Sequence, residues 1–125
     1  MMEPLVSVRL GENQRQYCPC DELTFAIQVD AVERAEVQAV EVSVLWYTEG
    51  KGDEDMGVHF FERRKSSESN DLRELHRAST VLPRSPLSYD GKIVKIRWCV
   101  RARCFMKRGR EYHEDFVFQL SARDD

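Results

Sequence analysis

The stretch that decides the fold is KIVKIRWCVRARCFMKRGREYHEDFVFQL, residues 92–120. From residue 94 to residue 106 every even position is apolar, whereas most odd positions are basic. The basic odd positions are Lys95, Arg97, Arg101 and Arg103. Successive side chains of a strand point to opposite faces. The pattern therefore predicts a strand that turns one face to a core and the other to solvent.

The same stretch predicts a hairpin whose loop is Lys107-Arg108-Gly109. Gly109 stands where a three-residue hairpin loop needs a left-handed backbone. A loop longer by one residue would set the apolar positions of one strand beside the polar positions of the other, which burial of one face forbids. The expected pairs are Trp98 with Phe118, Val100 with Phe116, Ile96 with Leu120, Arg101 with Asp115, and Arg103 with His113.

Earlier parts of the chain continue the two-residue period. We expect further strands at 5–10, 23–29, 40–48, 56–64 and 72–81. No stretch has a sustained helical period, and short strands separated by turn signals indicate two packed antiparallel sheets. The predicted fold class is all-β, an immunoglobulin-like β-sandwich of about seven strands. Its centre is expected to hold Trp46, Trp98, Phe116 and Phe118.

Length and composition narrow the class of protein. The chain has 125 residues, which suits one domain over 1–125. The net charge of -3 gives no reason to expect a nucleic-acid partner, and no apolar run reaches the ~20 residues of a membrane span. The first residues lack a basic stretch followed by an apolar core, so we expect no secretory signal, a cytoplasmic location and reduced cysteines.

Three segments resemble arrestin-fold proteins. LPRSPLSYDGKIVKIRWCVRA (82–102) resembles that family's proline-containing loop and following long strand, and VEVSVLWYTEGKG (40–52) its strand leading into an exposed loop. YCPCDELTFAIQV (17–29) lies where the family has a bend before its second strand. The resemblance implies an immunoglobulin-like sandwich, a single-domain member where arrestins have two domains. It does not carry over receptor contacts, because a sandwich hosts many unrelated tasks.

Candidate chemistry is sparse, and we expect neither an enzyme nor a cofactor. By parity Cys99 and Cys104 lie on opposite faces of one strand, which argues against one zinc site for all the cysteines. Asp53, Glu54 and Asp55 are calcium candidates in an exposed loop, although calcium wants six to eight oxygen ligands.

Protein recognition remains the expected function, through a sheet edge or through the end loops 49–55 and 83–91. The candidate contact residues are Arg97, Arg101, Arg103, Leu45 and Tyr47. Leu45 and Tyr47 share the solvent parity of their strand, so either they form an outer apolar patch or a twist or bulge buries them. The alternatives are an ion- or ligand-binding sandwich that uses the acidic loop and a structural homodimer subunit.

Overall fold

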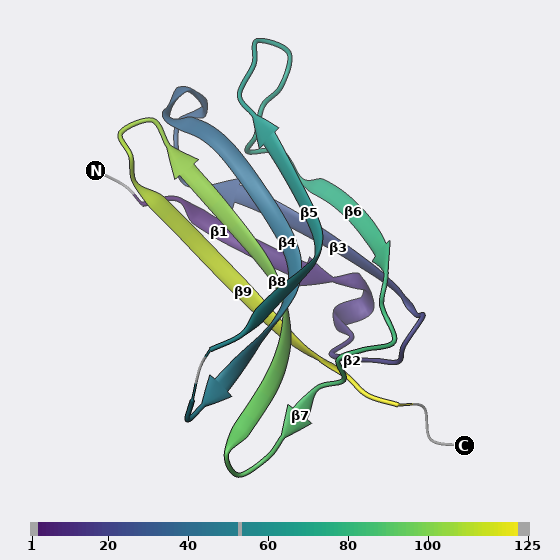
Figure 1. The fold of residues 1–125 in the computed structure, drawn as a ribbon. Coiled ribbons are helices and arrows are strands. Elements are labelled where there is room, and N and C mark those ends of the chain that lie inside the picture. Colours follow the sequence, from purple (N-terminus) through teal and green to yellow (C-terminus); the bar gives the residue numbers. More distant parts are fainter. Residues whose placement is uncertain (1–2, 53, 123–125) are drawn as a thin grey trace.

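The computed structural model describes residues 3–52 and 54–122 and contains two β-sheets packed face to face (Figure 1). One sheet has the order β1-β3-β6, with β1 at Leu5–Leu10, β3 at Glu22–Asp30 and β6 at His76–Val81. The other has the order β2-β9-β8-β4-β5. Its strands are β2 (Gln16–Tyr17), β9 (Glu111–Leu120), β8 (Val94–Met106), β4 (Val37–Gly50) and β5 (Met56–Lys65), and β7 (Tyr89–Asp90) pairs with the end of β8.

The predicted antiparallel β-sandwich is confirmed. All seven expected strands are present, and the structure adds β2 and β7, each two residues long. The pairing of β2 with β9 is parallel, whereas the other pairings are antiparallel. Two short 3-10 turns, Gly11–Asn13 and Arg34–Glu36, connect strands. Among the described residues no helix is long and apolar enough to cross a membrane.

The predicted hairpin register is confirmed over most of its length. Trp98 opposes Phe118 and Arg101 opposes Asp115, as the sequence predicted. Gly109 has a φ of 83°, and its amide donates to the carbonyl of Met106, which closes the three-residue loop. The predicted pairing of Ile96 with Leu120 is wrong: β8 bends away from β9 beyond Trp98, and Ile96 pairs with Tyr89 of β7 instead.

The core lies between the sheets and is centred on Trp98 and Phe118. Both are almost fully buried, and their rings lie 6.0 Å apart between centroids. Trp46 and Phe116, also predicted at the centre, are only half-buried and pack against its margin. The indole Nε1 of Trp98 donates to the carbonyl of Pro86 at 2.7 Å, which ties the loop 83–91 to the end of the core.

The predicted strand 72–81 begins only at His76. Its first four residues form a turn, because the Asp71 carboxylate accepts hydrogen bonds from the backbone and side chain of Arg73. The amide of Glu74 donates to the carbonyl of Asp71. Leu72 is buried there and anchors the turn in the core.

Candidate functional site

The basic row on the outer face of β8 is paired with acids. Arg101 donates to both carboxylate oxygens of Asp115, at 2.8 and 3.1 Å, and its side chain is only 19% exposed. Arg103 lies 3.4 Å from a carboxylate oxygen of Glu111, although His113 opposes it in register. The predicted contact residues of this row therefore form a largely neutralised sheet surface and not an open positive stripe.

Arg97, the third candidate of the row, lies nearer the end of the sheet. Its Nε is 3.2 Å from a carboxylate oxygen of Glu49 on the neighbouring strand β4. Its side chain stays about one-third exposed, so it is accessible to a partner only as part of this ion pair.

Of the two apolar candidates on β4, Leu45 is buried. The register of β4 against β5 shifts between Val44 and Leu45, which places a bulge there. Leu45 is flanked by Val58 on one side and Cys99 on the other, and only 3% of it is exposed. Of the two alternatives for Leu45, burial by a bulge is therefore confirmed, and the prediction that Leu45 contacts a partner is wrong. Tyr47 is half-buried on the same face, where burial raises the pKa of its hydroxyl.

The two cysteines of β8 are buried, and their thiols are less acidic than a free thiol. Cys99 lies on the outer face and Cys104 on the core face, and neither is exposed. Burial raises the pKa of the Cys99 thiol to about 12 and that of Cys104 to about 11. Because the thiolate is the nucleophile and the metal ligand, neither thiol is poised for either role near neutral pH.

The acidic loop is only partly described. Asp53, one of the three predicted calcium candidates, lies outside the described residues. Glu54 and Asp55 are exposed, and the Asp55 carbonyl accepts a hydrogen bond from the amide of Thr48 at 3.0 Å. Within residues 3–52 and 54–122 no three His, Cys, Asp or Glu side chains come together as a metal site.

Sequence reasoning missed the most exposed apolar group of the sheet, which lies on β5. Met56, Val58 and Phe61 are 56%, 53% and 55% exposed, and they lie on the outer face together. Regular alternation would put Phe61 on the opposite face from Val58. The extra residue of the bulge resets the alternation, and the only sequence signal for it is the adjacent pair Phe60-Phe61.

The outer edge of β5 is one edge of this sheet (Figure 1); at the other, β9 pairs with β2 only at Gln119 and Leu120. In the described part of the chain β5 pairs with β4 alone. Toward β6, His59 Nε2 lies 2.7 Å from the carbonyl oxygen of Val81, and His76 Nε2 is hydrogen-bonded to the carboxylate of Glu62. These contacts link β5 to β6. On the outward side of β5 the amide of Met56 donates to the Asp55 carboxylate at 2.9 Å, and the carbonyl of Lys65 accepts a hydrogen bond from the side-chain amide of Asn70 at 3.3 Å, so the accessible outward backbone lies between these two residues.

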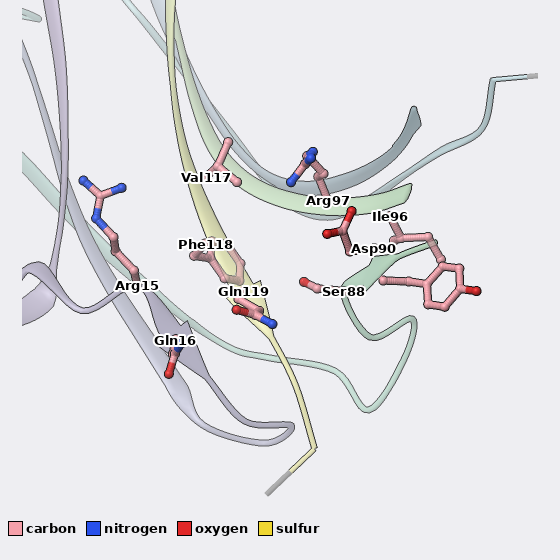
Figure 2. Close-up of a pocket in the computed structure, with 10 residues that line it drawn as sticks. Arg15, Gln16, Ser88, Asp90, Ile96, Arg97, Val117, Phe118 and Gln119 are labelled. Carbon is pink, nitrogen blue, oxygen red and sulfur yellow. The ribbon is translucent and has the colours of Figure 1, made fainter. Parts of the chain in front are cut away.

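A groove of about 420 Å³ lies at the other margin of the sheet, beside β9, β7 and β2 (Figure 2). Figure 2 shows Arg15 and Arg97 on opposite sides of it, with Phe118 and Gln119 between them. Arg15 stacks over the Phe116 ring at 4.8 Å from its centroid. The loop 83–91 forms one wall and is fixed to β9 by hydrogen bonds between Ser88 and Leu120. The groove has both polar and apolar lining side chains, and among the described residues that line it Asp90 is the one carboxylate.

Comparison with known proteins supports the fold. No protein-family model and no curated protein sequence matches the chain. Among solved structures, the sporulation control protein Spo0M from Bacillus subtilis superposes with a TM-score of 0.70 at 15% sequence identity. The match covers 98% of this chain and 51% of the Spo0M chain, so this chain spans about half the length of that protein. The likeness supports an arrestin-like fold and, at this identity, carries no function.

Proposed function

We propose that the chain is a non-enzymatic binding module that takes up an extended segment of a protein at the outer edge of β5. The observation that carries the proposal is the row Met56, Val58 and Phe61, three apolar side chains more than half exposed on an edge strand. An extended segment added to a sheet edge gains main-chain hydrogen bonds, and its alternate side chains gain apolar contacts. At this edge the outward backbone of β5 can make the main-chain hydrogen bonds, and the exposed side chains of Met56, Val58 and Phe61 can make the apolar contacts.

Natural edge strands usually carry charge or are covered, because an open apolar edge invites association. Arg63 and Lys65 at the end of β5 follow that rule, whereas the first half of the strand does not. This contrast supports a binding role for the edge. A cytoplasmic location is part of the proposal and rests on the sequence alone.

Affinity capture with matched variants tests the proposal. The wild-type domain and a Phe61→Lys variant are immobilised and exposed to the same protein extract. Leu5→Lys on β1 and Val117→Lys on β9 serve as controls, since each adds the same charge at an exposed apolar position elsewhere. We expect specific binders to be lost with Phe61→Lys and kept with both controls. Binders that survive Phe61→Lys, or that require Val117, would count against the β5 edge.

A calcium titration separates the main alternative. A ligand that binds only the folded state raises its melting temperature by mass action. We expect millimolar calcium to leave the melting temperature unchanged. A clear rise that disappears in a Glu54→Gln/Asp55→Asn variant would favour the ion-binding sandwich.

A further inference from the structure

Two hydrogen bonds fix which backbone groups of β5 point toward β4. At one end the amide of Thr48 donates to the carbonyl of Asp55, and at the other the amide of Ser66 donates to the carbonyl of Gln38, each at 3.0 Å. Successive residues of an antiparallel strand point their amide and carbonyl alternately to one neighbour and to the other. The alternation counted forward from Asp55 and the alternation counted backward from Ser66 meet at the bulge, where His59 is the extra residue.

The backbone groups that point outward therefore belong to residues on both sides of the bulge. They are those of Met56, Val58, Phe61, Arg63 and Lys65. In the single chain the Met56 amide donates to the Asp55 carboxylate and the Lys65 carbonyl accepts from Asn70, so a strand that pairs with both ends of the edge must displace these two side-chain hydrogen bonds. The spacing is uneven, because two residues separate Val58 from Phe61 and one residue separates the other neighbours. A strand that pairs along the whole edge must match this uneven spacing.

A second β5, running antiparallel, matches it. When Val58 of one copy opposes Phe61 of the other, Met56 opposes Arg63, and every outward group meets an outward group. If the second strand is shifted by two residues, Phe61 opposes Phe60 or Val58 opposes His59. The backbone groups of Phe60 and His59 point to β4, so in these registers the outward groups of Phe61 or Val58 have no partner. By two-fold symmetry each pair occurs twice.

The charges of the strand are also self-complementary in this register. Acidic residues precede β5, and basic residues end it. Antiparallel pairing sets Glu54 opposite Lys65 and Asp55 opposite Arg64, again twice. Opposite charges across a strand pair stabilise it, and like charges destabilise it.

We infer that the segment bound at the β5 edge is β5 of a second copy of this chain, so that the domain forms a two-fold dimer with one sheet continuous across both copies. The inference rests on the proposed function, since it names the partner of the same edge. Val58 and Phe61 of the two copies then cover one another on the outer face and lose the exposure they have in the single chain.

Sedimentation equilibrium of the full, reduced chain over a range of concentrations tests the inference. We expect a reversible dimer for the wild type and for the controls Leu5→Lys and Val117→Lys. Phe61→Lys places two lysines against apolar side chains at the centre of the interface, and we expect the dimer Kd to rise by roughly 100-fold. Circular dichroism and melting curves confirm that each variant is folded.

A charge exchange makes the register itself testable. Glu54→Lys and Lys65→Glu each create two like-charge pairs in their own homodimer, and each should weaken it by roughly tenfold. Mixed together, they form a heterodimer in which both pairs have opposite signs again. We expect the mixture to dimerise almost as tightly as the wild type.

The outcomes separate this inference from the proposed function. A dimer that Phe61→Lys weakens and that the mixed charge variants restore upholds both. A wild-type monomer at all concentrations overturns the inference, and the proposed function stands if capture still depends on Phe61. A dimer indifferent to Phe61→Lys, or charge variants that gain nothing on mixing, overturns the β5 pairing.

Discussion

Replacing Trp98 by alanine should remove a large share of the stability of the domain. Trp98 is 1% exposed and packs against Phe118 and the imidazole of His59. Truncating a buried Trp costs about 3–5 kcal/mol through lost contacts and the cavity left behind. The indole also donates to the Pro86 carbonyl, and an acceptor left without its partner adds a penalty of about 1 kcal/mol or more. We therefore expect a loss of about 4–6 kcal/mol, where the total stability of a globular protein is of the order of 5–15 kcal/mol.

Urea unfolding followed by far-ultraviolet circular dichroism measures this loss. With an m-value of about 2 kcal/mol/M, the midpoint should fall by roughly 2–3 M. Trp46→Ala is the matched control, since the same residue type there is only half-buried, and it should cost clearly less. A loss below about 1 kcal/mol for Trp98→Ala would refute the placement of Trp98 at the centre and with it the register of β8.

Three further predictions concern individual side chains. Hydrogen bonds from Arg73 lower the pKa of Asp71 from 3.8 to about 2. The pair therefore contributes stability that is present above pH 4 and lost as pH falls through 2. Carbon-detected NMR titration should measure a pKa of about 2 for Asp71, and Arg73→Gln should return this pKa toward 3.8. Burial raises the pKa of the Cys99 thiol to about 12, so iodoacetamide at pH 8 should label Cys99 only after unfolding, as measured by mass spectrometry of the peptide that contains it. Because the pKa is higher in the folded than in the unfolded chain, the free energy of unfolding should also fall as pH rises from 9 toward 12. A double-mutant cycle on Arg101 and Asp115 should give a coupling of about 1 kcal/mol or less in salt-containing buffer, because the pair is partly exposed.

The sequence could predict what depends on local pattern. The alternation over 94–106 predicted both faces of β8. Gly109 predicted the three-residue hairpin loop, because a loop longer by one residue would set apolar positions beside polar ones. The pattern could not reveal where β8 parts from β9. Ile96 leaves β9 for Tyr89 because the loop 83–91 inserts at that point, which is a tertiary effect.

The candidate site was harder to predict, because one inserted residue reverses which face each following side chain occupies. The bulge at His59 moves Phe61 to the same face as Val58, and it accompanies the burial of Leu45. The basic row was visible in the sequence, yet its partners Glu49 and Glu111 depend on how neighbouring strands align. Prediction from pattern alone therefore favoured the residues that the fold neutralises or buries over those it exposes.

The bulge in β5 bears on specificity as well as on exposure. A bulge ordinarily protects an edge, because a regular strand that approaches it loses register at the extra residue. Beside β5, a regular strand can follow the outward groups before His59 or those after it, but not both. A second β5 carries its extra residue at the same place, and the two-fold axis passes between His59 and Phe60, so one bulge opposes the other. The bulge therefore limits a regular strand to half of the edge and lets a second β5 pair along all of it, which is how an interface gains specificity by penalising competitors.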